Sequence, residues 1–268
     1  MARDVSRRVL ARLGWHPYIV WRRITSPIRT RHRRRQRQGP ELAPSRSAGP
    51  VPADWTLRLP ESALASTGWA FVEDVLDRTA HAALVAAWPP RNEFAPMRIS
   101  ERTKTYDTGG RLRHPSPESL QTVHPGLQDI YRWLSSPATS TVIADASGFD
   151  VAMQCYWILA NESFWGSGLA PHRDTPAPDS SGLDRRVNLI YFVDANGRGW
   201  DAGGTSILVT NNFKQPIFVP TNLRNSALIY RTGSDFFHGF PPMKFGKYRR
   251  VVTAHYAPVQ CQLSSNKN

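Results

Sequence analysis

Two histidines and one aspartate have the residue types and spacing of a metal site. His172 and Asp174 stand two positions apart, so on a strand their side chains would point to the same face. His238 follows 64 residues after Asp174 and directly precedes Gly239. Two imidazoles and one carboxylate form the facial set of ligands that holds non-haem iron(II) and leaves other coordination positions open. The three residues therefore predict an iron site that can react with O2.

An arginine eleven residues past His238 predicts an anion-binding position. Arg249 starts the strand-like run Arg250–Tyr256, and alternation puts Arg249 and Thr253 on one face, with Arg250 on the other. A buried guanidinium needs an anionic partner, and a dicarboxylate would bind it in bidentate geometry. The alternative is that Arg249 and Arg250 form surface ion pairs, and this pattern alone does not exclude it.

Short apolar runs predict the sheets that would position these side chains. Beyond residue 150 the runs alternate with clusters of Gly, Pro, Asn and Asp, a pattern typical of an antiparallel sandwich or barrel. The expected strands are Val151–Leu159, Val187–Val193, Thr205–Val209, Pro216–Val219, Ala227–Tyr230 and Arg250–Tyr256. On the second of these, Asn188 would face the metal and Tyr191 would face away.

Helical patterns come before these strands. After a short strand at 68–72, apolar residues recur at helical spacing over 76–87 and 127–134. A third helix is expected between the cap Ser136-Pro137 and a stop at Gly148. Helices followed by strands predict an α+β fold, a double-stranded β-helix (jelly roll) with the N-terminal helices packed on one sheet.

The positive charge is concentrated in an N-terminal arm, residues 1–38. Residues 1–40 hold twelve Arg, no Lys and one acid, a net +11, which leaves +2 of the chain's +13 for the other 228 residues. A nucleic-acid footprint over the whole domain is therefore not expected. Val5, Val9 and Leu13 predict a basic amphipathic helix in the arm, which would contact an anionic surface of lipid or nucleic acid. A solvated tail and a helix packed on a partner protein are the alternatives.

Composition sets the domain limits and the compartment. Proline-rich residues 39–54 read as a linker, followed by a globular domain at 55–262 with its jelly-roll core at about 150–258. Cys155 and Cys261 lie in no metal-binding motif, so two reduced thiols in a cytoplasmic protein are expected, although a disulfide between them stays open. No apolar stretch is long enough to span a membrane, so any membrane contact would be peripheral, through residues 1–38.

Four ordered motifs resemble a known family. The segment from His172-Arg-Asp174 through Gly-Leu-Asp-Arg-Arg to Tyr191 resembles the core of the prolyl-hydroxylase-like branch of the 2-oxoglutarate/iron(II) oxygenases. Trp200–Leu208 is similar to the family's Gly-Gly hairpin, and Phe237-His-Gly-Phe-Pro241 is similar to its distal His-Gly motif. Arg249 begins the counterpart of its terminal strand. The resemblance covers about residues 68–258.

The resemblance implies a dioxygenase of the EC 1.14.11 type that hydroxylates a small molecule or a peptidyl side chain. It implies that His172, Asp174 and His238 hold iron(II) and that Arg249 binds 2-oxoglutarate. O2 would be the other cosubstrate, and ascorbate would support activity. The further candidate cosubstrate contacts are Asn188, Thr253 and Tyr156.

The chain departs from the family pattern at three places. Phe192 stands where the family usually has a tyrosine that touches the cosubstrate, and Val251 stands where Ser or Thr is common. Thr253, on the same face as Arg249, is the candidate replacement. The segment between Tyr156 and His172 is about six residues longer than in the family pattern. The extra residues would form either part of the substrate mouth or a plain surface loop.

Two other classes of protein stay open at this stage. One is a jelly-roll binding protein that has lost catalysis, against which the complete set of three ligands and Arg249 argue. The other is a nucleic-acid oxygenase that holds its substrate with the Arg-rich arm, against which the near-neutral domain argues. The oligomeric state and the substrate do not follow from the residues.

Overall fold

A computed structural model of the chain describes residues 55, 57–59, 62–96, 105–106, 110–114, 124–174, 182–232 and 235–259. The chain divides into two compact units, Met1–Ser45 and Arg46–Asn268, and all the described residues belong to the second. The predictions for the basic arm, for the linker and for Cys261 lie outside the described residues. Among the described helices, none is long and apolar enough to cross a membrane.

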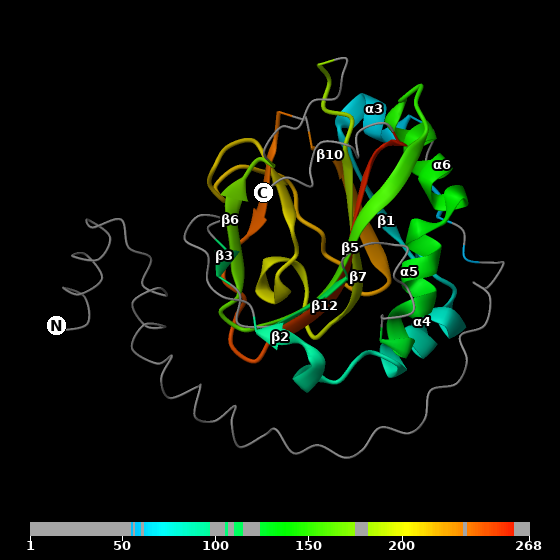
Figure 1. Cartoon of the computed structure of the whole chain (residues 1–268). Coiled ribbons are helices and arrows are strands. Elements are labelled where there is room, and N and C mark those ends of the chain that lie inside the picture. The colour runs from blue at the N-terminus through cyan, green and yellow to red at the C-terminus, as the bar shows by residue number, and fades with distance from the viewer. Residues whose placement is uncertain are drawn as a thin grey trace. The chain divides into compact units, whose positions relative to one another are not determined.

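Two antiparallel sheets make up most of the described domain (Figure 1). The larger sheet has the order β1 (Trp69–Glu73), β10 (Ser226–Arg231), β7 (Val187–Ala195), β12 (Tyr248–Pro258), β5 (Met153–Phe164), β4 (Gly110–His114) and β2 (Ala95–Pro96). The smaller sheet has the order β3 (Thr105–Tyr106), β6 (Gly168–His172), β11 (Phe237–Phe240), β8 (Ser206–Leu208) and β9 (Pro216–Phe218). The predicted antiparallel double sheet is confirmed.

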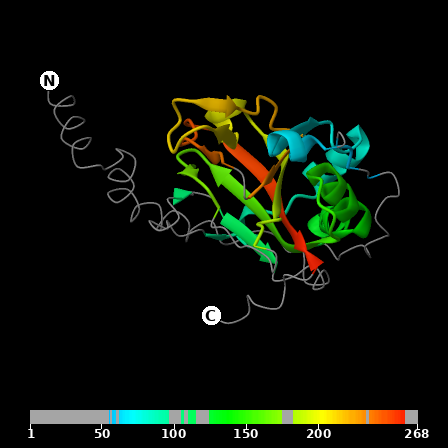
Figure 2. The ribbon, with the colours of Figure 1, turned by 90° about the horizontal axis from the view of Figure 1, so that it is seen from above.

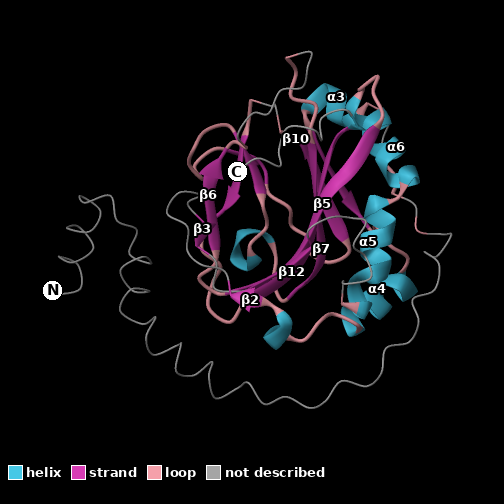
Figure 3. Ribbon diagram, viewed as in Figure 1, coloured by secondary structure: helices cyan, strands magenta, loops and turns pink. Residues whose placement is uncertain are grey.

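The α-helices gather on one side of the larger sheet, as the two ribbon views show (Figures 2 and 3). They are α3 (Ala63–Thr67), α4 (Arg78–Ala86), α5 (Gln128–Ser135) and α6 (Pro137–Ser147), joined by the short 3-10 helices η1 (Arg91–Glu93) and η3 (Pro125–Leu127). A further 3-10 helix, η4 (Gly199–Ala202), precedes β8. The α-helices precede β5–β12 as predicted, but β2, β3 and β4 lie between α4 and α5 in the chain and were not predicted.

Local capping fixes two of these helices. Asp77 begins α4 by accepting hydrogen bonds from the backbone N–H groups of Thr79 and Ala80. Ser136 begins α6 by accepting from the backbone N–H of Thr139 at 3.2 Å, with Pro137 in the first turn. Gly148 ends α6 in the left-handed region at φ 64°, which a glycine adopts without steric cost. These are the cap and stop that the sequence predicts.

Side chains alternate between two cores on the central strands β7 and β12. One core lies between the larger sheet and the helices, and the other lies between the two sheets. The helix-facing core includes Leu189, Tyr191, Val193, Val252, Ala254 and Tyr256. The inner core includes Ile190, Phe192, Leu228, Tyr230 and Val251. The larger sheet is therefore apolar on the helix side, while its inner face mixes apolar and polar groups.

The connection between Tyr156 and His172 differs from the expected loop. β5 continues to Phe164, and the chain returns as β6 through a tight turn in which Gly166 has φ 79°. The sequence hides this extension because polar residues occupy the strand. Asn161 and Ser163 are buried and hydrogen-bonded to each other at 3.0 Å, so they need no solvent.

Candidate metal centre

Three ligand side chains meet on the inner side of the smaller sheet. His172 ends β6 and lies opposite His238 of β11 in the strand register. Asp174 Oδ1 lies 3.8 Å from Nε2 of His172 and 3.7 Å from Nε2 of His238. The three ligand atoms lie within 4.8 Å of one another. The structure thus brings together the three residues that the sequence nominates, with one correction: β6 ends at His172, so Asp174 lies just beyond the strand and not on it.

The protonation states suit metal binding. Burial lowers the pKa of His238 well below its ordinary value, and the neighbouring His172 acts in the same direction. His172 Nδ1 donates to the carbonyl oxygen of Ala170 at 2.9 Å, which fixes the ring and leaves Nε2 free of a proton. Burial raises the pKa of Asp174, while the nearby His172 opposes that rise. A metal ion requires neutral imidazoles and an ionised carboxylate, so binding would release any proton on Asp174.

Behind these ligands lies a polar pair from two adjacent central strands. Asn188 Nδ2 donates to Asp174 Oδ2 at 2.8 Å and lies 3.3 Å from the hydroxyl oxygen of Tyr230. That hydroxyl is 3.2 Å from His238 Nε2. Sequence reasoning placed Asn188 toward the metal but missed Tyr230, because a tyrosine in an apolar strand looks like packing. Tyr230 stands two residues after Leu228 and so shares its face of the strand, and this alternation could have indicated that the tyrosine points inward.

Arg249 lies on the inner face of the larger sheet and Arg250 on the outer face. Arg249 is 7% exposed, and it donates to the carbonyl oxygen of Gly203 and to Thr205 Oγ1 at 3.2 Å. Its guanidinium also lies 3.8 Å from the centre of the Phe240 ring. Arg250 instead pairs with Glu162, with Nε 3.2 Å from Oε1. The alternation therefore separates the two arginines as the sequence predicts.

A glycine makes room for this buried arginine. Gly203 has φ 83°, and a Cβ atom built there would lie 3.1 Å from Arg249 Cδ and 2.9 Å from Met243 Sδ. The guanidinium covers the ring of Phe240, which follows His238 by two residues on β11. Two residues of a strand correspond to about 7 Å between Phe240 and His238. Arg249 therefore lies between the sheets, a short distance along β11 from the metal ligands.

The other two predicted cosubstrate contacts lie on two adjacent strands of the larger sheet, β12 and β5. Thr253 is a half-buried residue of β12, opposite Ile190 of β7. Tyr156 lies at an irregularity in the pairing of β5 with β12, where a bulge re-aims side chains. Burial raises the pKa of Tyr156, while a hydrogen bond and the charge of Arg186 oppose that rise. Tyr156 thus lies beside Arg186, and the charge of Asp174 adds to the rise in the pKa of Tyr156.

His255 belongs to the same edge of the site. Its ring lies 4.4 Å from the Trp157 ring and 6.1 Å from the Tyr156 ring. Burial lowers the pKa of His255 to about 4, although Asp174 opposes this. His255 is therefore a neutral histidine packed against the rings of Tyr156 and Trp157.

The extra residues before His172 do not shape the metal side. The turn at Gly166 stands at the opposite end of β6 from His172, about 13 Å away for four residues of strand rise. Trp165 in this turn packs against Phe245, with ring centres 5.4 Å apart. This turn therefore lies away from the metal ligands, and whether it borders the substrate entrance stays a prediction.

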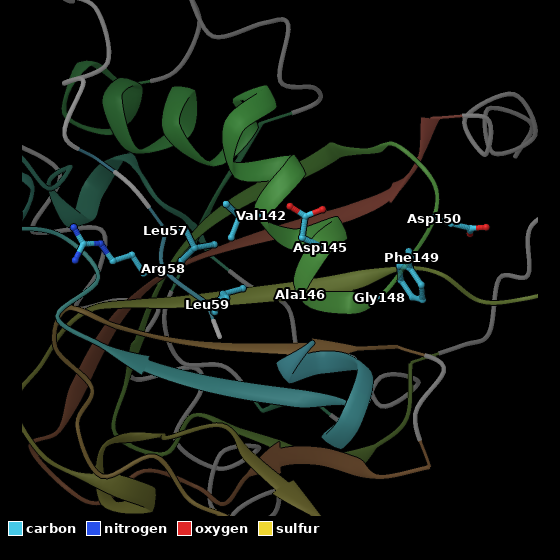
Figure 4. A pocket seen from close by; sticks show the side chains of 9 residues that line it. All are labelled: Leu57, Arg58, Leu59, Val142, Asp145, Ala146, Gly148, Phe149 and Asp150. Carbon is cyan, nitrogen blue, oxygen red and sulfur yellow. The ribbon is translucent and has the colours of Figure 1, made fainter. Parts of the chain in front are cut away.

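Two further histidines, His81 and His124, have structural partners. His81 Nε2 lies 2.7 Å from the carbonyl oxygen of Val193, and His124 caps η3 by accepting from the backbone N–H of Gly126. A surface hollow elsewhere is lined by residues of the segment 57–59 and of the α6 end, including Val142, Asp145 and Phe149 (Figure 4). None of its lining residues is a metal ligand, so this hollow is separate from the metal centre.

Comparison with known proteins supports the fold. No protein-family model matches the chain, and no curated protein sequence matches it. Among solved structures it is similar to a prolyl hydroxylase from Trichoplax adhaerens in complex with a hypoxia-inducible-factor peptide, with a TM-score of 0.56 and 16% identity, over 75% of this chain and 89% of that chain. A Pseudomonas putida prolyl-4-hydroxylase gives a TM-score of 0.51 and 16% identity, over 73% and 95%.

A third similar structure has a different activity. It is a non-haem, α-ketoglutarate-dependent epimerase of nogalamycin biosynthesis, with a TM-score of 0.53 and 12% identity, over 73% of this chain and 80% of that chain. At these identities the likeness concerns the fold. The chain therefore has the double-stranded β-helix fold of 2-oxoglutarate- and iron(II)-dependent oxygenases, in the form shared by prolyl hydroxylases, and this expectation from the sequence is confirmed.

Proposed function

We propose that the chain is an iron(II)- and 2-oxoglutarate-dependent dioxygenase that hydroxylates a small molecule or a peptidyl side chain. The observation that carries the proposal is the convergence of His172, Asp174 and His238, with ligand atoms within 4.8 Å of one another. This convergence occurs inside the fold that such oxygenases share. The inward-facing Arg249, on β12 of the larger sheet, adds the expected anchor for a dicarboxylate.

The residues present fit both groups. Two neutral nitrogen donors and one carboxylate oxygen suit iron(II) and leave positions for other ligands. Asn188 Oδ1 is buried beside Asp174 and has no hydrogen-bond partner among the described residues, which suits a site completed by a bound group. When bound, iron(II), 2-oxoglutarate and O2 would supply the oxidation, with 2-oxoglutarate decarboxylated to succinate and the substrate hydroxylated.

The chain's own part would be to orient these groups. The hydrogen bond from His172 Nδ1 to Ala170 aims Nε2 at the metal position. Arg249 would hold the distal carboxylate of 2-oxoglutarate, since a charge-assisted pair is strong where water is excluded. Thr253, Tyr156 and Asn188 are further proposed contacts of the cosubstrate. Ascorbate would support turnover by keeping the iron reduced.

Two structural neighbours suggest the substrate classes to test. One structural neighbour holds a peptide and another belongs to nogalamycin biosynthesis, so both a peptidyl and a small-molecule substrate are consistent with this fold. For the arm we propose a peripheral contact with an anionic surface, because residues 1–40 carry +11 of the net charge. The proposed location is the cytoplasm, with contact to a membrane through residues 1–38. No helix among the described residues is long and apolar enough to span a membrane.

The test is succinate release by the purified full-length chain with iron(II), ascorbate and 2-oxoglutarate across a panel of peptidyl and small-molecule substrates. We expect substrate-stimulated succinate in the wild type and none with Asp174→Ala. Iron analysis of the same samples separates a catalytic protein from a jelly-roll binding protein. Absence of both iron binding and succinate release would overturn the proposal. A nucleic-acid substrate would reveal itself by binding that weakens steeply with salt.

A further inference from the structure

The two carboxylate oxygens of Asp174 have different neighbours. Oδ1 faces the two histidine nitrogens, at 3.8 Å from His172 and 3.7 Å from His238. Oδ2 accepts a hydrogen bond from Asn188 Nδ2 at 2.8 Å. Oδ1 is therefore the oxygen placed to bind a metal held by the two histidines, while the amide holds Oδ2.

The amide itself is held by a neighbouring strand. Asn188 of β7 and Tyr230 of β10 are direct partners in the antiparallel register, so their side chains lie side by side on the same face. Asn188 Nδ2 lies 3.3 Å from the Tyr230 oxygen, which gives each of its two N–H groups an acceptor. The two residues are 3% and 4% exposed, so water does not compete for these bonds.

The Tyr230 hydroxyl also meets the metal ligand His238. Its oxygen is 3.2 Å from His238 Nε2, and a neutral imidazole can accept the hydroxyl proton there. A metal ion would occupy that nitrogen lone pair, so the hydroxyl proton would then need another acceptor. The acceptors within reach would be Asp174 or a group in one of the remaining coordination positions. Tyr230 is thus a donor beside the metal whose direction depends on metal occupancy.

We propose that Asn188 and Tyr230 are positioning residues that keep Asp174 a one-oxygen ligand and so leave a coordination position open for cosubstrate and O2. This inference rests on the proposed iron site. A carboxylate without such a partner can turn and bind through both oxygens, which would fill a position that the reaction needs. A simple strand-pairing role would place the same two residues together but would have no effect on the metal.

Co(II) is a suitable probe because its visible absorption reports the number and arrangement of its ligands. The experiment compares Co(II) affinity and absorption in the wild type, Asn188→Leu, Tyr230→Phe and His172→Ala. Tyr191→Phe is the matched control, since Tyr191 is buried on the same β7 strand and its hydroxyl bonds Asn225 at 2.9 Å on the helix side. Thermal unfolding checks that each variant is folded.

For Asn188→Leu we expect Co(II) affinity to fall about 10- to 100-fold, with an altered absorption spectrum, because outer partners of metal ligands have effects of this size. For Tyr230→Phe we expect a smaller loss, below about tenfold, with a spectral change in the same direction. Tyr191→Phe should match the wild type in both measurements. These results would support the positioning role.

Other outcomes separate this inference from the proposed function. If His172→Ala loses Co(II) while Asn188→Leu and Tyr230→Phe behave like Tyr191→Phe, the inference is wrong and the iron site stands. If His172→Ala keeps wild-type affinity, the iron site itself is wrong. Should Asn188→Leu not fold, Tyr230→Phe decides alone, since it removes a single oxygen. A tyrosinate absorption band in the iron(III) protein, absent from Tyr230→Phe, would overturn the positioning role by showing that Tyr230 is a ligand.

Discussion

The two faces of the larger sheet differ in composition although the same strands build them. On β7, Leu189 and Tyr191 face the helices, whereas Asn188 faces the metal ligands. On β12, Val252 packs under the helices, while Arg249 points between the sheets. One face excludes water with apolar side chains, and the other uses the resulting rigid frame to hold polar groups at fixed positions. Substitutions on the two faces should therefore fail in different ways.

The largest effect is expected from the metal ligands. His172→Ala, Asp174→Ala and His238→Ala should each abolish substrate-dependent succinate release and strongly weaken iron(II) binding, because each removes one of three protein ligands. The far-ultraviolet circular dichroism spectrum should stay that of the wild type, since the helix-facing core is untouched. Near-wild-type turnover in any one of the three would show that the ligand assignment is wrong.

A helix-face substitution should give the opposite result. Leu189 is fully buried in the helix-facing core, so Leu189→Ala should lower the free energy of unfolding by about 2–5 kcal/mol in urea titrations. Iron(II) affinity of the remaining folded protein should be close to that of the wild type. Leu183→Ala is the matched control, because this leucine is 55% exposed and should change stability by about 0.5 kcal/mol or less. Equal effects at both positions would contradict the assigned core.

Arg249 and Arg250 test the difference between the two faces of the larger sheet at adjacent positions of β12. Arg249→Leu should weaken 2-oxoglutarate binding at least about tenfold, from a lost charge pair of about 2–5 kcal/mol, with iron binding nearly unchanged. Arg250→Leu should leave 2-oxoglutarate affinity as it is, because this guanidinium pairs with Glu162 on the outer face. Isothermal titrations of both variants decide, and the reverse pattern would end the assignment of Arg249.

A smaller loss is expected at a helix cap. Ser136→Ala removes the side-chain acceptor of the Thr139 backbone N–H, and the free energy of unfolding should fall by about 1 kcal/mol. Activity per folded molecule should not change, because α6 lies on the helix side of the larger sheet. Chemical denaturation measures the first quantity and succinate release the second. A cap variant that lost activity at unchanged stability would break the division between the faces.

The smallest effect is expected from removing the arm. Deletion of residues 1–50 should leave turnover on a small substrate close to that of the full chain, since the arm carries its own charge of +11 and precedes a proline-rich stretch. Turnover of both forms is measured on the same substrate once one is found. If the truncated chain does not fold, the arm belongs to the domain.

Much of the fold could be predicted because its signals are local. Short apolar runs mark β7, β10 and β12, and the Ser136-Pro137 cap with Gly148 marks the ends of α6. The strands β6 and β11 were not predicted, although they carry His172 and His238. They are short, and the residues that matter most on them are polar because they face the site. β5 was predicted too short for a similar reason, since Asn161 and Ser163 satisfy each other inside the protein.

The site could be predicted only as far as pairwise spacing and resemblance allow. Spacing nominated His172 and Asp174, yet it could not show that the strand ends between them. Tyr230 was missed because its role depends on a register partner 42 positions earlier, Asn188, and on the separate strand of His238. Contacts that join three strands have no signature in a single stretch of sequence.

Two separate requirements meet at Gly203: a left-handed backbone conformation and free space for the side chains beside it. Its backbone has φ 83°, which other residues adopt only with strain, and a side chain there would press on Arg249 and Met243. A side chain at this position would therefore disturb both the local backbone and Arg249, the proposed anchor of 2-oxoglutarate. A saturation library at Gly203 should yield fewer active variants than one at Gly182, which has a similar φ of 80° but where a Cβ atom would meet nothing within 4 Å, so the difference between the two libraries reports the contact with Arg249 and Met243.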